Sequence, residues 1–86
     1  MAGIFESKLA ELGVTLPDAP APAANYVPFV QVGDLVHVSG QISNNADGFI
    51  IGKLGDTMSD EEGAVAAKTC AIALLAQAKA ACGGDL

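Results

Sequence analysis

The sequence predicts a small α+β fold in which a short helix, a β-hairpin with a short third strand and one long helix follow one another. Three patterns predict it. Apolar residues recur at helical spacing near the N-terminus, two runs rich in valine and aromatic residues occupy the middle, and an alanine-rich stretch of helical character follows. At 86 residues the chain is long enough for one domain at most, so we treat residues 1–86 as a single domain.

The first predicted element is a helix over Ile4–Leu12, which Gly13 ends. Three apolar side chains share one face of this helix: Phe5, Leu9 and Leu12. The proline- and alanine-rich segment over residues 17–24 is then expected to be extended. Too little chain precedes this segment for a linker between domains, so we expect it to cross the surface of the one domain.

Two β-type runs, Asn25–Gln31 and Leu35–Ile42, predict a hairpin because a glycine and an aspartate lie between them. Pro28 has no N–H to donate to a ladder, so the first strand is expected at a sheet edge or at a bulge. A cluster of turn residues over 44–48 leads to a short third strand over Phe49–Ile51.

Ser59 is expected to open the long helix, because Ser59 and Glu62 have the spacing of a capping box. Two further acids in the first turn, Asp60 and Glu61, favour the positive end of the helix dipole. The helix should run to about Cys82, where two glycines end it. Its polar residues form no single stripe, so we expect it to be covered on more than one side, by the sheet and by another subunit.

The composition favours self-association and argues against nucleic acid. The chain is 51% hydrophobic but has no tryptophan, one tyrosine and three phenylalanines. Small side chains bury little area each, so an isolated monomer would have a thin core and a homo-oligomer is expected. A net charge of −6, with four lysines and no arginine, argues against binding to phosphates.

The N-terminus lacks a basic start and an uninterrupted apolar stretch, so a cytoplasmic protein without a secretory signal is expected. The stretch Ala64–Cys82 comes nearest to a membrane span by length. Three polar residues interrupt it: Lys68, Gln77 and Lys79. Because alanine also contributes little to insertion, we expect a soluble buried helix and no membrane partner.

No cofactor or metal site is predicted. Cys70 and Cys82 would lie about 18 Å apart along one helix, too far for a disulfide within the chain, and are interpreted as small buried hydrophobes. His37 stands in the middle of a predicted strand and is interpreted as a satisfied structural histidine. The acids that precede and open the long helix are interpreted as caps and solvated charge: Asp56, Asp60, Glu61 and Glu62.

The pattern Gly48-x-x-x-Gly52-Lys53 is one residue short of a phosphate-binding loop. Leu54 stands where that loop needs serine or threonine to bind magnesium, so nucleotide binding is not expected. No nucleophile–base pair can be assembled from the sequence, and we therefore assign no catalytic residue.

The predicted hairpin is preceded by an A-P-x-Y-type segment, Ala21–Val27, and contains Val30, Gly33-Asp34-Leu35 and an S-G-Q motif within Val38–Gln41. This combination resembles the opening of the RidA/YjgF family of reactive-intermediate deaminases, also called the endoribonuclease L-PSP family, whose signature is S-G-Q. It implies the first half of a chorismate-mutase-like α+β domain that assembles as a homotrimer with clefts between subunits. Active members hydrolyse enamines and imines derived from amino acids to keto acids and ammonia.

Three positions match residues that line the family's cleft: Tyr26, Ser39 and Gly40. Each also has a purely structural interpretation. Tyr26 could simply pack a core as a strand aromatic, Gly40 could allow a bulge or a close backbone approach, and Ser39 could satisfy a neighbouring backbone group.

The resemblance stops before the family's catalytic groups. Active members use an arginine that clamps the substrate carboxylate and an acid that positions water, and both would lie beyond Leu86, so we expect a truncated domain. The chain has no arginine, and lysine cannot make the bidentate hydrogen bonds that arginine makes to a carboxylate. Further copies of the chain in a homo-oligomer could therefore not supply the missing arginine. We expect a catalytically silent oligomeric module with a small-molecule cleft; the alternative is a residual imine or enamine deaminase at an intersubunit cleft. Two chains would pair to imitate one full domain, and further assembly would imitate the trimer.

Overall fold

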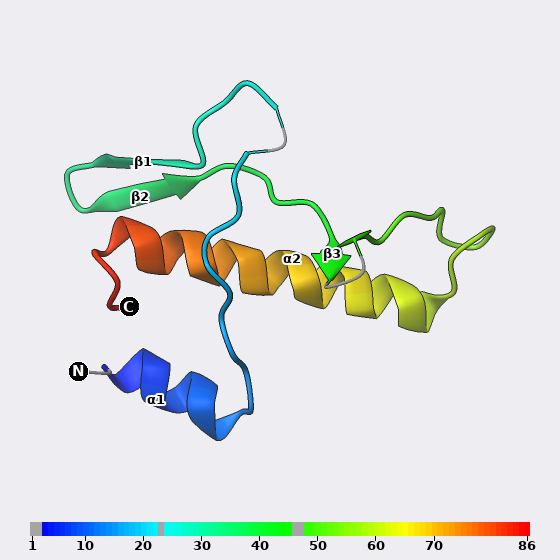
Figure 1. The fold of residues 1–86 in the computed structure, drawn as a ribbon, viewed down its shortest axis with the longest axis horizontal. Coiled ribbons are helices and arrows are strands. Elements are labelled where there is room, and N and C mark those ends of the chain that lie inside the picture. Colours follow the sequence, from blue (N-terminus) through cyan, green and yellow to red (C-terminus); the bar gives the residue numbers. More distant parts are fainter. Residues whose placement is uncertain (1–2, 23, 46–47) are drawn as a thin grey trace.

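In the computed structural model of the chain, residues 3–22, 24–45 and 48–86 are described. The elements follow in the order α1 (Ile4–Glu11), β1 (Phe29–Val32), β2 (Leu35–Val38), β3 (Asn44–Asn45), β4 (Gly48–Phe49) and α2 (Asp60–Ala81). Figure 1 shows α2 as the axis of the molecule, with the β1–β2 hairpin above its C-terminal half and α1 below it. The predicted α+β class and order of elements are confirmed.

The long helix begins and ends where the sequence predicts. The Ser59 hydroxyl accepts a hydrogen bond from the backbone N–H of Glu62 at 3.2 Å, and the Ser59 N–H donates to Glu62 Oε1 at 3.0 Å. This reciprocal capping box satisfies two backbone donors that a helix start otherwise leaves unpaired. At the other end, Cys82 caps the helix before the two glycines.

The capping box makes stability depend on the charge of Glu62. Hydrogen bonds from the backbone N–H and then the hydroxyl of Ser59 hold the pKa of Glu62 below its ordinary value of 4.5. A carboxyl with a lowered folded-state pKa contributes stability that is present above its unfolded pKa and is lost as the pH falls through its folded pKa. We expect Glu62→Gln to lower the melting temperature at neutral pH, and the difference from wild type to shrink below pH 4.5.

Thermal melts followed by circular dichroism across this pH range measure the effect. Glu61→Gln is the matched control, because Glu61 lies in the same first turn but outside the capping box. A deficit in Glu62→Gln that stays constant from neutral to acidic pH would contradict the assignment.

The hairpin is shorter than predicted. Its antiparallel register pairs Phe29 with Val38 and Val32 with Leu35. The expected first strand, Asn25–Gln31, begins only at Phe29, because Pro28 cannot donate to the ladder and lies just outside it. The expected second strand, Leu35–Ile42, ends at Val38. Along β2 the side chains alternate between half-buried and exposed, so one face packs on α2 and the other faces solvent.

The third strand pairs differently from the prediction. The expected strand Phe49–Ile51 is reduced to β4, which does not join the hairpin but pairs with β3 in a separate two-stranded sheet. β3 lies within residues 44–48, which were expected to form a turn, and residues 46–47 between the two strands lie outside the described residues. Ser43 extends the pairing, because its carbonyl accepts from the Ile50 N–H and its hydroxyl donates to the Ile50 carbonyl.

The proline-rich segment crosses α2 (Figure 1), which agrees with the expectation that it runs over the surface of the domain. One buried side chain of α2 bonds to it there. Gln77 of α2 is only 1% exposed, and its Nε2 donates to the Pro20 carbonyl at 2.8 Å and to Gln41 Oε1 at 3.4 Å. No helix forms among the described residues of this segment. Gln77 therefore joins three parts of the chain that are distant in sequence.

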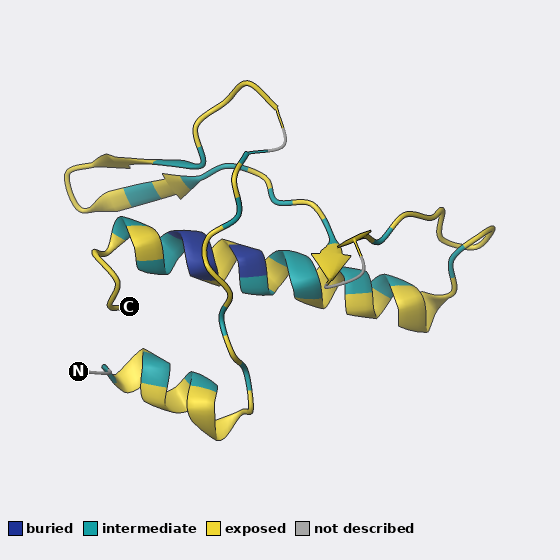
Figure 2. Ribbon diagram, viewed as in Figure 1, coloured by how far each residue is buried: buried dark blue, intermediate teal, exposed yellow. Residues whose placement is uncertain are grey.

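The core is thin, as the composition predicts. Among the described residues, those that are buried lie on α2: Ala73, Ala76 and Gln77 (Figure 2). The chain exposes 6202 Å², whereas a compact monomer of this mass exposes about 4,700 Å². Its radius of gyration of 14.3 Å also exceeds the roughly 12 Å of a compact chain of this length. The chain therefore exposes about 1,500 Å² more than a compact monomer of its mass would.

The expectation of a buried α2 is wrong for the single chain. Only one face of α2 is covered, and 17% of its most apolar window is buried. By length and composition alone α2 is also apolar enough to cross a membrane, a test that core helices of soluble proteins pass as well. The uncovered surface of α2 is the main feature that the isolated fold leaves unexplained.

Candidate functional site

Tyr26, Ser39 and Gly40 lie together at the base of the hairpin. The Tyr26 hydroxyl donates to the Gly40 carbonyl at 3.3 Å, and the Ser39 hydroxyl donates to the Val27 carbonyl at 2.5 Å. The backbone N–H of Ser39 also donates to the Pro28 carbonyl at 2.9 Å. These bonds join the segment before β1 to the segment after β2.

A hollow of about 360 Å³ adjoins this cluster, between the proline-rich segment and the β3–β4 sheet. Tyr26 lines it, together with Gln41, Asn44 and Phe49. Ser39 and Gly40 lie beside the hollow without lining it. A second hollow of about 600 Å³ shares the Gln41 and Phe49 walls and extends to Cys70 on α2.

Among the described residues, those that line the hollow beside Tyr26 are uncharged. They contribute phenol, amide and apolar groups and no acid, lysine or histidine. The Tyr26 and Ser39 hydroxyls each donate to a backbone carbonyl and not to a side-chain base that could activate them. Within the described ranges, no three potential metal ligands come together. The arrangement can hold a small uncharged ligand by hydrogen bonds, and apart from the Tyr26 phenol its described lining offers no side chain that is commonly a general acid or base.

The structure also tests the interpretations of the two cysteines, of His37 and of the acidic start of α2. Both cysteines are free, but Cys70 is half-buried and Cys82 is exposed, so the interpretation as buried hydrophobes is wrong for Cys82. His37 lies within β2, as expected of a structural histidine, on the exposed outer face of the strand and opposite Val30. Asp60 and the capping box begin α2 as predicted.

The glycine–lysine pattern forms no phosphate loop. Gly48 lies in β4, and the backbone N–H of Lys53 donates to the Thr57 hydroxyl four residues on. The segment therefore closes on itself before α2 begins at Asp60.

Sequence reasoning missed Gln41 and Gln77. Gln41 donates from Nε2 to the Ser39 carbonyl at 3.1 Å and accepts from Gln77, so it links the cluster at the hairpin base to α2. The available signal was Gln77 itself, a neutral amide in the apolar C-terminal half of α2. A buried amide must be satisfied by hydrogen bonds, which predicts partners from elsewhere in the chain.

The chain is similar to proteins about twice its length. It is 42% identical over 83 residues to protein TCP17 of Trypanosoma cruzi, covering 95% of this chain and 52% of that protein. The crystal structure of protein Atu1372, of unknown function, from Agrobacterium tumefaciens superposes with a TM-score of 0.77 at 40% identity, over 96% of this chain and 49% of that one.

A crystal structure of a candidate endoribonuclease from Shewanella oneidensis superposes with a TM-score of 0.81 at 34% identity, over 91% of this chain and 52% of that one. The sequence matches no family model. The chain thus spans about half the length of each of these relatives. At these identities the likeness extends beyond the fold, and the match to about half of the candidate endoribonuclease confirms the expected resemblance to the RidA/YjgF (endoribonuclease L-PSP) family and to half of its domain fold.

Proposed function

We propose that this chain is a catalytically silent RidA/YjgF-like module that assembles with further copies and offers a small-ligand cleft beside Tyr26. The observation that carries the proposal is the chemistry of the cleft: its lining holds no charged group among the residues that the structure describes, and the Tyr26 and Ser39 hydroxyls donate to backbone carbonyls. The absence of arginine from the sequence supports it, because no copy of the chain can supply a bidentate grip on a carboxylate.

The exposed area supports self-association. The excess of about 1,500 Å² over a compact monomer is larger than the roughly 800 Å² that each partner buries in a standard interface. Large apolar side chains are exposed on every element except β3, including Phe5, Val32, Leu35 and Phe49. Burial of these side chains against a partner would remove apolar surface from water.

An enamine-hydrolysis assay tests the silent assignment. We expect 2-aminoacrylate to decay, and ammonia to appear, at the same rate with and without the purified chain. Tyr26→Phe and Ser39→Ala are the matched variants, since each removes one hydroxyl from the cluster. Faster decay with the wild-type chain that either variant abolishes would overturn the proposal and establish residual deaminase activity.

Ribonuclease activity is the further activity to test, because the Shewanella protein is described as a candidate endoribonuclease. A net charge of −6 and only four basic residues disfavour RNA binding. Labelled single-stranded RNA incubated with the chain is expected to stay intact.

A further inference from the structure

One flank of α2 carries an apolar seam that the described chain leaves largely exposed. Its residues recur at alternating spacings of three and four: Ala64, Ala67, Ala71, Leu74, Ala78 and Ala81. The first four are exposed and the last two half-buried, and Leu74 is 41% exposed. This is the a/d pattern by which two helices pack side by side. The buried face of α2, around Ala73 and Gln77, is a different one.

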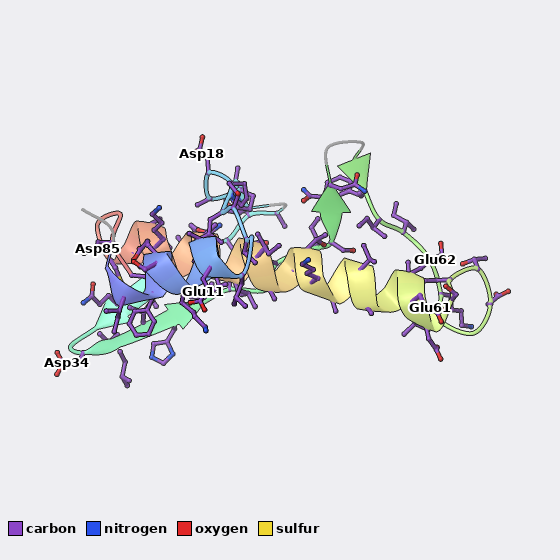
Figure 3. The ribbon with its side chains drawn as sticks, turned by 90° about the horizontal axis from the view of Figure 1, so that it is seen from below. Glu11, Asp18, Asp34, Glu61, Glu62 and Asp85 are labelled. Carbon is purple, nitrogen blue, oxygen red and sulfur yellow. The ribbon has the colours of Figure 1, made fainter. Side chains whose placement is uncertain are left out.

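The charges of the chain favour a second copy as the partner of this seam. The chain has ten acids and four lysines, so two copies repel each other wherever their acidic surfaces come close. They can therefore meet most easily through a surface that carries no acids. Between Gly63 and Gly84 the sequence contains no acid. Figure 3 shows Glu61 and Glu62 at one end of α2, Asp85 at the other and Asp34 at the tip of the hairpin. The middle of α2 is therefore a surface on which two copies can meet.

The same charges favour an antiparallel pair. In a parallel pair the acidic first turns, which contain Asp60, Glu61 and Glu62, would lie side by side. In an antiparallel pair the acidic first turn of one α2 approaches the last turn of the other, which carries Lys79, and the two helix dipoles oppose each other. Asp85 lies beyond the helix and is directed towards Gly3, on the α1 side.

We propose that two copies of this chain associate through their α2 seams in an antiparallel pair. In this register Ala67 of one copy faces Ala78 of the other, and Ala71 faces Leu74. Alanines let the helix axes approach to about 8 Å, and the two leucines fill the centre. The inference rests on the proposed self-association and specifies its interface. This chain covers about half the length of each relative, so two copies together would have about the length of one relative.

The first test is the mass in solution by light scattering, measured on wild type and two variants. Leu74→Glu buries an unpaired carboxylate in the seam, and we expect the dissociation constant to rise at least about 100-fold, so that the monomer mass appears. Val65→Glu is the matched control: Val65 is 57% exposed on the same helix but outside the seam, and the wild-type mass should be kept.

The second test is disulfide trapping, which does not depend on a destabilising variant. In a background with Cys70→Ser and Cys82→Ser, Ala67→Cys and Ala78→Cys are prepared separately and mixed. Oxidation should link position 67 of one copy to position 78 of another. Neither variant alone should form a linked dimer, because like positions lie about 16 Å apart along antiparallel axes.

The results of these two tests distinguish a failure of the proposed seam from a failure of the proposed self-association. A monomeric wild type that melts cooperatively overturns both. A wild-type oligomer that Leu74→Glu leaves intact, or that Val65→Glu disrupts equally, overturns only the seam. Links between like positions in either single variant overturn the antiparallel arrangement.

Discussion

Replacing Gln77 with alanine is expected to lower the free energy of unfolding by about 3 kcal/mol. The Gln77 side chain is 1% exposed and bonds to the Pro20 carbonyl and to Gln41. Loss of the amide leaves the Pro20 carbonyl without this donor, which costs about 1–3 kcal/mol, and the deleted atoms leave a cavity with a cost of its own. The proline-rich segment also loses its anchor to α2.

Urea unfolding followed by circular dichroism, at one fixed protein concentration, measures this loss. Gln77→Met keeps most of the volume but removes the amide, so we expect a smaller loss, on the order of 2 kcal/mol. Gln31→Ala is the control, because the amide of Gln31 donates only to the exposed Gly33 carbonyl; its loss should stay near 0.5 kcal/mol. A Gln77→Ala loss no larger than that of Gln31→Ala would contradict the role of Gln77.

The helices could be predicted because their signals are local. The capping box needs only Ser59 and Glu62, three residues apart, and the stop at Gly13 needs only the left-handed conformation that glycine adopts, with φ +75°. Both helices therefore begin and end within one residue of the prediction. Such signals act before any tertiary contact forms.

The strand ends could not be predicted to the residue, because strand pairing depends on partners distant in the chain. Nothing local shows that Phe49 pairs with Asn44 rather than with the hairpin. Asparagine is poor in strands by propensity, and its polar side chain favours turns. Here the backbone of Ser43 and the pairing with β4 hold Asn44 in an extended conformation instead.

The residues of the candidate site could be predicted, but their hydrogen-bond partners could not. The motif placed Tyr26, Ser39 and Gly40 close together, because the two ends of a hairpin must meet. Which carbonyl each hydroxyl would bond to could not be predicted, since it depends on how the segment before β1 folds back. The role of Gln41 depends on α2, more than thirty residues away in sequence.

The second large effect is expected at the turn of the hairpin, where Gly33→Val should lower the free energy of unfolding by about 2 kcal/mol. β1 and β2 are joined by two residues, Gly33 and Asp34, and Gly33 has φ +59°, whereas Asp34 does not have a positive φ. This is the pattern of a type II′ turn, whose twist suits a hairpin and whose first position favours glycine. A β-branched residue there is strained.

The expected loss comes from the backbone rather than from a clash. A Cβ at Gly33 would meet no atom within 4 Å, so the space is open and the conformation alone opposes valine. Asp34→Ala is the control in the same turn, and its loss in urea unfolding should stay within about 0.5 kcal/mol. Equal losses in the two variants would show that the turn is not of this type. A loss confined to Gly33→Val would show that the conformation of this glycine supports the hairpin, which packs on α2.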